Sequence, residues 1–178
     1  MTTFTNYDLN ERAVLAMYER YQLNLNQVID AINTERGQVS GVSYPLSHPA
    51  LILSAPPVKG QMTQFPIVAI GDGDIRFVDD VGWAATGVYE MFVLAYDVDT
   101  DPIALAWKMR RWAQALISVS MFGRNMDSDS YMGAWGVRLK RIIPGPRLSR
   151  TDPQAMPGQI VAWICVVLEL HDEQNPVA

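Results

Sequence analysis

The chain has 178 residues, a net charge of −5 at pH 7 and a hydrophobic share of 49%. At about 150 residues per domain, this length predicts a single domain. The apolar content is enough for a packed core and excludes wholesale disorder. The single cysteine excludes an internal disulfide framework and a cysteine-rich zinc site. The acidic balance argues against a general nucleic-acid surface.

The beginning of the chain does not have the pattern of a signal peptide, because no basic start precedes an apolar core. The longest strongly apolar stretch, Ile160 to Leu170, is about half the length that a membrane-spanning helix needs. We therefore expect no membrane contact, and the unpaired Cys165 fits a cytosolic origin.

Residues 1–36 are predicted to contain a helix that covers the core. Asp8 and Glu11 have the spacing of a capping box, and the pair Arg36 and Gly37 indicates its end. Apolar residues recur on one face of this helix, at Val14, Tyr21, Leu25, Val28 and Ile32. Residues 37–66 follow as a proline-rich connection with one strand at 50–54, and long connections of this kind are usually functional.

Residues 67–171 are expected to form a core of sheet and helix, followed by a tail at 172–178. Strand candidates lie at 65–70 and 75–78, and the sequence Gly-Asp-Gly-Asp at 71–74 predicts a turn between them. A second turn or extended tip at 79–87 contains Trp83. The long strand at 88–98 is apolar at both even and odd positions, which predicts that both of its faces are covered.

A second helix is predicted to begin at Pro102, after the capping sequence Asp-Thr-Asp, and to run to Phe122. Its buried stripe is Leu105, Met109, Trp112, Leu116 and Val119. The opposite polar arc carries Trp107, Arg110 and Arg111. A tryptophan flanked by arginines is favoured at protein interfaces, so we expect this arc to contact a partner.

The last two strand candidates are Trp135–Ile143 and Ile160–Leu170. The first alternates, with Leu139, Arg141 and Ile143 on one side and Arg138 and Lys140 on the other. The second is apolar on both sides, which predicts a central strand. The fold class expected from this order is α+β, with a mainly antiparallel sheet packed against an N-terminal helix and a central amphipathic helix.

Charge is divided into blocks along the chain. Residues 72–101 hold one basic and eight acidic residues, a net charge of −7, whereas residues 102–150 hold nine basic and two acidic residues, a net charge of +7. Either folding interleaves these blocks into an ordinary surface, or opposite blocks meet between copies of the protein. The basic residues of the second half of that region are Arg138, Lys140, Arg141, Arg147 and Arg150.

Catalytic and metal-binding patterns are weak. A solvated acidic turn is the default explanation of the acidic side chains of 72–80, and a weak cation site is the alternative; these residues are Asp72, Asp74, Asp79 and Asp80. Cys165 lies in an apolar run, where a thiol is inert. His48 and His171 do not have the spacing of a metal pair. We therefore expect neither an enzyme nor a bound metal or cofactor.

The order of these elements resembles the tail terminator and tail-completion proteins at the neck of tailed bacteriophages. Three segments carry the resemblance: Tyr89–Leu116 (YEMFVLAYDVDTDPIALAWKMRRWAQAL), Trp135–Pro146 (WGVRLKRIIPGP) and Ile160–Glu173 (IVAWICVVLELHDE). It implies a virion protein assembled in the host cytoplasm as a ring, commonly of six subunits. Such a ring caps the tail tube and binds the head connector or adaptor, and DNA passes through its lumen without sequence-specific binding.

By this resemblance, the acidic hairpin with Asp72, Asp74, Asp79 and Asp80 would line the lumen or touch the tail tube. The expected contacts with neighbouring subunits or partners are Trp83, Trp107, Arg110, Arg111, Arg138, Lys140, Arg141, Arg147 and Arg150. Two other interpretations stay open. The chain could be another phage connector, adaptor or tail-tube protein, or an α+β domain that binds or converts a small molecule.

Overall fold

The computed structural model describes residues 6–40, 44–58, 62–80, 84–122, 135–150, 155 and 157–172. Within these residues the chain forms two helices and one sheet of six strands. The elements are α1 (Asn6–Ser40), β1 (Leu51–Leu53), β2 (Ile67–Asp80), β3 (Ala84–Asp99), α2 (Pro102–Phe122), β4 (Trp135–Pro144), β5 (Leu148–Ser149) and β6 (Ile160–Asp172).

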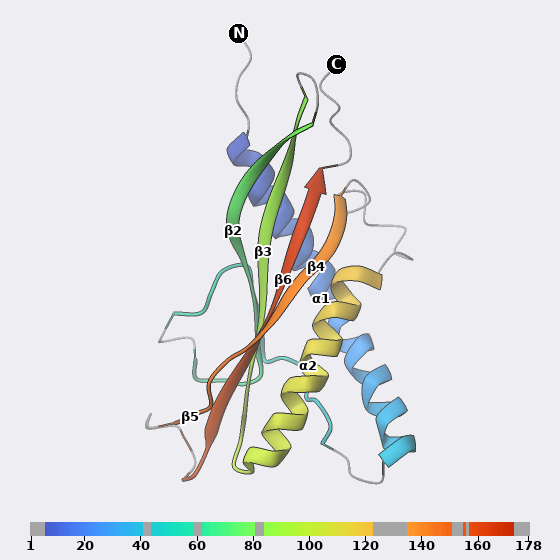
Figure 1. Cartoon of the computed structure of the whole chain (residues 1–178). Helices are drawn as coiled ribbons and strands as arrows, with labels where there is room; N and C mark the ends of the chain where they lie inside the picture. The colour runs from blue at the N-terminus through green and yellow to red at the C-terminus, as the bar shows by residue number, and fades with distance from the viewer. Residues whose placement is uncertain are drawn as a thin grey trace.

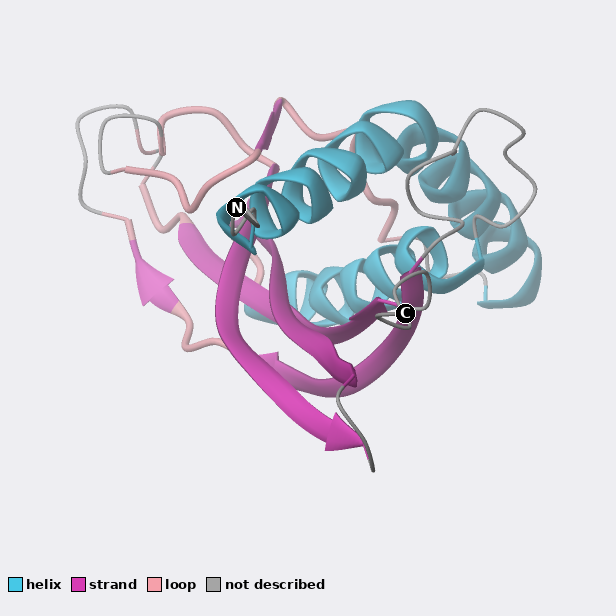
Figure 2. Ribbon diagram, turned by 90° about the horizontal axis from the view of Figure 1, so that it is seen from above, coloured by secondary structure: helices cyan, strands magenta, loops and turns pink. Residues whose placement is uncertain are grey.

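The strand order is β1-β2-β3-β6-β4, with the short β5 paired to β6 (Figure 1). Only the pair β1 and β2 is parallel, and every other pair is antiparallel. The predicted α+β class is confirmed, and so is the central position of the last strand. Both helices pack on the same face of the sheet, which curves around them (Figure 2). Helix α1 lies over β1 and β2, and α2 lies over β3, β6 and β4.

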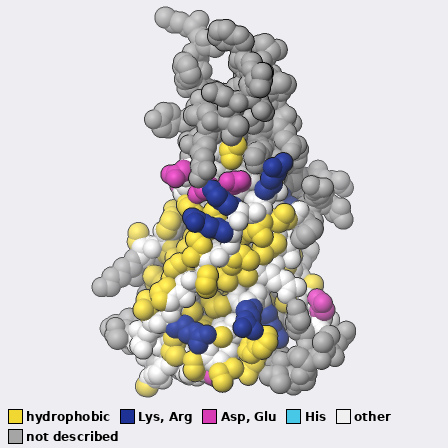
Figure 3. All heavy atoms as spheres, in the orientation of Figure 1, with side chains coloured by type: hydrophobic (Ala, Val, Ile, Leu, Met, Phe, Trp, Pro, Cys, Tyr) yellow, Lys and Arg dark blue, Asp and Glu magenta, His cyan; other side chains and the backbone are white. Residues whose placement is uncertain are grey.

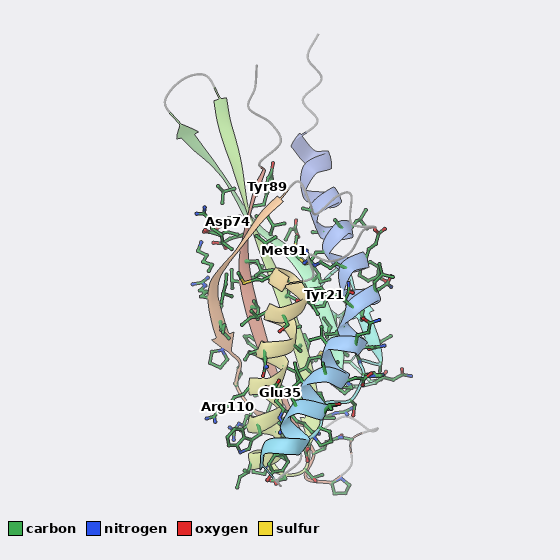
Figure 4. All side chains as sticks on the ribbon, turned by 90° about the vertical axis from the view of Figure 1, so that its right-hand side faces the viewer. Tyr21, Glu35, Asp74, Tyr89, Met91 and Arg110 are labelled. Atoms are coloured by element: carbon green, nitrogen blue, oxygen red, sulfur yellow. The ribbon has the colours of Figure 1, made fainter. Side chains whose placement is uncertain are left out.

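The core lies between the helix layer and the sheet. Helix α1 contributes Met17, Tyr21 and Leu25, and α2 contributes its predicted stripe, of which Trp112 and Leu116 are fully buried. The hydroxyl of Tyr21 donates to the carbonyl oxygen of Leu116 at 2.6 Å and shares a hydrogen bond with the hydroxyl of Ser120 at 2.7 Å. Burial raises the pKa of the Tyr21 phenol far above its usual range, so the side chain joins the two helices as a neutral group (Figure 4).

Helix α1 extends beyond its predicted end. The pair Arg36 and Gly37 was expected to stop the helix, but it continues to Ser40. A glycine inside a helix costs only about 1 kcal/mol relative to alanine, and a long helix that packs on α2 and β2 tolerates this cost. The prediction of the end was therefore wrong by one turn.

Strand β2 corrects the predicted turn at 71–74, because it runs without interruption from Ile67 to Asp80. Its pairing with β3 shifts between Asp72 and Ile75, so that two residues of β2 lie opposite the single residue Glu90. This is a β-bulge, and glycine and aspartate suit a bulge as well as a turn. The partner of β2 in the hairpin is therefore the long strand β3.

The start of α2 is capped as predicted. The carboxylate of Asp101 accepts a hydrogen bond from the backbone N–H of Ile103 at 2.8 Å, which satisfies one of the free donors of the first turn. The carboxylate of Asp99 lies 2.8 Å from the ammonium of Lys108. Partial burial acts to raise the pKa of Asp99, but the hydrogen bond and charge of Lys108 outweigh it, and the pKa is lowered. These contacts fix the angle between β3 and α2.

Candidate subunit interface

The face of the sheet opposite the helices is strongly apolar. Residues directly opposite each other in an antiparallel pair point to the same face, so the register defines rows across the strands. One row runs Ala69, Leu94, Cys165 and Ile143, and the next runs Gly71, Phe92, Val167 and Arg141. A third row adds Ile67, Tyr96 and Trp163. We call these eleven residues the open sheet face.

No described helix covers the open sheet face. Figure 3 shows it towards the viewer as a broad apolar surface, with lysine and arginine side chains above and below its centre. Phe92, Leu94 and Tyr96 are partly exposed, and they bury the smaller residues beside them. The prediction that both faces of the 88–98 strand are covered holds only in part for this face, because Val88 and Glu90 are buried but Phe92, Leu94 and Tyr96 are partly exposed. An apolar pattern on both sides of a strand also fits a contact with another molecule.

Lys140 lies at one end of the open sheet face, at a bulge in β4 where the register shifts between Leu139 and Arg141. This extra residue corrects the simple alternation predicted for the strand, because it places Leu139 and Arg141 on opposite faces. The Lys140 ammonium contacts the carboxylate of Glu90 and lies 3.1 Å from that of Glu169. One cation thus balances two carboxylates that face each other across β3 and β6.

Three other basic side chains of this region, Arg138, Arg141 and Arg147, are exposed and make no ion pair with any residue that the structure describes. Arg141 lies close enough to Cys165 to influence its thiol, which places the guanidinium over the open sheet face. Arg150 instead holds its own loop, because it donates to Gln159 at 2.9 Å and lies 4.9 Å from the centre of the Phe65 ring.

The outer surface of α2 carries the predicted tryptophan. Trp107 is 46% exposed, and the guanidinium of Arg110 lies 4.8 Å from the centre of its ring. Ile103, one turn earlier, is 62% exposed. Arg110 projects on the side towards which the open sheet face points (Figure 4). Arg111, expected on the same polar arc, is buried, and its guanidinium donates to the carbonyl oxygen of Tyr44. The placement of Arg111 was therefore wrong, because the connection after α1 packs over that position.

The predicted acidic hairpin is described in part. Asp72 and Asp74 are exposed on β2, and Figure 4 shows Asp74 on the side of the sheet away from the helices. The backbone of Asp79 and Asp80 belongs to β2, but their side chains lie outside the described residues, as does the whole of Trp83. Asp72 and Asp74 therefore remain available to a partner, whereas the structure adds nothing on the other three.

Much of the acidic block is engaged within the subunit. Glu90 contacts Lys140, and Asp99 contacts Lys108. Asp97 is buried, and its carboxylate accepts hydrogen bonds from the indole N–H of Trp112 at 2.9 Å and from the backbone N–H of Val98 at 2.7 Å. Burial raises the pKa of Asp97, while the Trp112 hydrogen bond and the charge of Lys108 act to lower it. Three of the eight acidic residues are thus engaged within the subunit, whereas Asp72, Asp74 and Asp101 are exposed.

Reactive groups do not gather in the described part of the chain. Cys165 is buried, and desolvation raises the pKa of its thiol to about 11, against the smaller opposite effect of Arg141. Among the described residues no three histidine, cysteine or acidic side chains lie close enough to hold a metal ion. Neither described helix is long and apolar enough to cross a membrane.

No family model matches the chain, and no curated protein matches its sequence.

The open sheet face is the feature that the sequence reasoning missed. The charged residues were chosen because they stand out in the sequence, whereas Phe92, Leu94 and Trp163 were assigned to a covered core. The sequence does contain a signal for this face, because apolar residues stand at both the even and the odd positions of β3 and β6. Because both helices pack on one face, no described helix covers the other face, and loop residues such as Pro56, which lies against Gly71, cover only part of it.

Proposed function

We propose that this protein is a structural subunit of a tailed-bacteriophage virion. In this proposal it is a tail terminator, which forms a ring at the neck, caps the tail tube and joins it to the head connector. Each subunit contributes binding surfaces rather than reactive groups. The order of elements supports the proposal, since the segments that resemble the terminator family form β3 with α2, β4 and β6 of a single sheet-and-helix unit.

The open sheet face carries this proposal. Phe92, Leu94, Tyr96 and Trp163 are partly exposed on this face, and adjoining apolar side chains of this kind mark a site of protein association. Its centre is made of Phe92, Leu94 and Trp163, and large apolar and aromatic side chains supply most of the binding energy of interfaces. The arginines at its ends set register and association rate rather than affinity.

A ring needs two different complementary surfaces on each subunit, because a head-to-tail contact closes only when each copy offers a donor and an acceptor patch. The open sheet face is one such surface. Trp107 with Arg110 forms a further exposed patch, which we assign to the tail tube or the connector. The exposed Asp72 and Asp74 would face the lumen, where carboxylates repel DNA phosphates and let the duplex pass.

The test is the mass of the purified chain over a range of concentrations. Native mass spectrometry and negative-stain imaging should show a closed ring, expected to hold six subunits of 19.9 kDa. The ring added to polymerising tail tubes should stop their growth at a defined end. A ring that leaves tube growth unchanged argues for a connector or adaptor. A chain that stays monomeric at high concentration and converts a substrate contradicts the proposal.

A further inference from the structure

We infer that the partner of the open sheet face is the outer surface of α1 on a second copy of this chain. This inference rests on the proposed function and goes further, because it names the two surfaces that meet at each ring contact. The partner surface is a stripe along α1, which we call the α1 stripe: Leu15, Glu19, Leu23, Asn26 and Asp30.

The α1 stripe holds two large apolar side chains, Leu15 and Leu23, that are exposed in the described part of the subunit. Leu15 is 46% and Leu23 63% exposed, although leucine is usually buried. The five residues follow each other at steps of four or three, so they lie on one side of the helix, opposite the buried side chains of Met17, Tyr21 and Leu25. Two large apolar side chains one above the other on a helix suit insertion into a flat apolar sheet.

The charges of the two surfaces are opposite. The α1 stripe carries the carboxylates of Glu19 and Asp30 and no basic side chain, and the Asp30 carboxylate lies 2.8 Å from the exposed imidazole of His48. The open sheet face carries Arg141, with Arg138 next to it on β4. Arg141 would thus meet Glu19 of the neighbouring copy, since Asp30 already contacts His48 of its own subunit.

Charge also decides between the two helices. The exposed stripe of α2 has Trp107 at its centre and Arg110 beside it, and that guanidinium would meet Arg141 of the open sheet face. Like charges facing each other across an interface are unfavourable. The α1 stripe has the same apolar character and the opposite sign, so it is the better partner.

The two surfaces lie on opposite sides of the subunit. The open sheet face lies on the side of the sheet away from the helices (Figure 2), and the α1 stripe lies on the side of α1 opposite its buried residues. A contact between them is therefore head-to-tail, and each copy can bind one neighbour on either side. This geometry produces a ring when the rotation between copies closes.

The experiment is a charge exchange in the full chain. Arg141→Glu and Glu19→Arg are each expected to raise the dissociation constant of the ring about tenfold, and the double variant should recover most of the loss. Leu23→Asp should prevent assembly at concentrations where the unchanged chain is fully assembled. The matched control is Glu35→Arg, because Glu35 is exposed on the same helix about 160° around the axis from Glu19.

Analytical ultracentrifugation gives the assembly state, and circular dichroism with thermal melting shows that each variant is folded. Folded single variants that assemble like the unchanged chain overturn the inference and leave the proposed function standing. The inference is also overturned if the double variant assembles no more strongly than the single variants. An unchanged chain that never assembles overturns both. Loss of assembly in Glu19→Arg and Leu23→Asp, with Glu35→Arg unaffected, supports the α1 stripe.

Discussion

Trp112 and Asp97 form a buried pair between α2 and β3, in which an indole N–H neutralises part of the cost of a buried carboxylate. The donor lies 2.9 Å from the Asp97 oxygen and favours its charged form. Burial already raises the pKa of Asp97, so the fold holds this carboxylate at some cost in stability at neutral pH. The pair is therefore a place where pH and stability are coupled.

Replacement of Trp112 by phenylalanine removes the donor and raises the pKa of Asp97 further in the folded state, while the unfolded state is unchanged. An acid with a raised pKa in the fold costs stability above its unfolded pKa and not below it. Trp112→Phe should thus lower the free energy of unfolding by about 2–4 kcal/mol at pH 7.5 and by less at pH 4. Urea unfolding at both pH values measures this difference.

Tyr21→Phe is the control for that experiment. It also removes a buried hydrogen bond, but its partners, the Leu116 carbonyl and the Ser120 hydroxyl, are neutral. The loss of about 1–3 kcal/mol should be the same at pH 4 and pH 7.5. Equal pH dependence in the two variants would show that Asp97 does not titrate as its surroundings require.

Single residues were predicted least well where their partner is distant in the sequence. The helical periodicity of α2 gave its buried stripe correctly, because that pattern depends only on neighbours one turn away. Arg111 was placed on the exposed arc, yet it donates to the Tyr44 carbonyl, 67 positions earlier in the chain. Lys140 was expected at a subunit contact, but a bulge directs it to Glu90 and Glu169. Neither partner follows from periodicity.

Among the elements, β2 depends on a glycine at its bulge. A β-carbon at Gly73 would lie 2.6 Å from the Phe92 ring and 2.9 Å from the Glu90 β-carbon. Both distances are shorter than such contacts allow, and the Glu90 atom belongs to the start of a side chain that cannot rotate away. The close approach of the two strands at this point requires glycine.

Gly73→Ala is therefore expected to destabilise the protein by about 1–3 kcal/mol, because Phe92 and Glu90 must both shift. Gly71→Ala, two residues earlier on the same strand, is the matched control. Its β-carbon would meet only the Pro56 ring at 3.4 Å, so this variant should be neutral or gain up to about 1 kcal/mol from the stiffer unfolded chain. Thermal unfolding of the two variants compares them, and equal melting temperatures would contradict the role of the bulge.

Element types were predictable from the sequence, and element ends were less so. Both helices and the long strands follow from periodicity. The capping residue Asp101 marks the start of α2, whereas the predicted capping pair Asp8 and Glu11 lies inside α1, which begins at Asn6. The Gly-Asp-Gly-Asp segment was taken as a turn, because its composition suits a turn and a bulge equally. Pairing with β3 makes this segment a bulge, and the residues of β3 that pair with it lie some 20 positions away in the chain. The extension of α1 beyond Gly37 has the same origin, since packing outweighs local preference.

In the whole molecule, several residues of the two charge blocks form ion pairs or hydrogen bonds within their own subunit. Lys108 and Lys140 pair with acidic residues of β3 and β6, and Arg111 and Arg150 bind oxygen atoms of their own subunit. Arg138, Arg141 and Glu19 are exposed and make no ion pair with the described residues. In the proposed ring, few charges would therefore take part in the contact between subunits.

This balance predicts how assembly should respond to salt. Repulsion between subunits that each carry a net charge of −5 acts over the distance between their centres and is already screened at 0.15 M salt, where the Debye length is about 8 Å. Further salt then weakens mainly the contact between the arginines of the open sheet face and the carboxylates of α1. Stopped-flow light scattering should show assembly slowing several-fold between about 0.15 and about 1 M sodium chloride, because the Debye length falls from about 8 Å to about 3 Å over this range.

The ring itself should persist in about 1 M salt at micromolar subunit concentration. Salt does not screen the burial of apolar surface, which contributes about 25 cal/mol of stabilising free energy per Å². Sedimentation velocity at the two salt concentrations gives the assembled fraction. A ring that dissociates completely in high salt would be held by its charges, and Phe92, Leu94 and Trp163 would then have some other role than the one proposed for them.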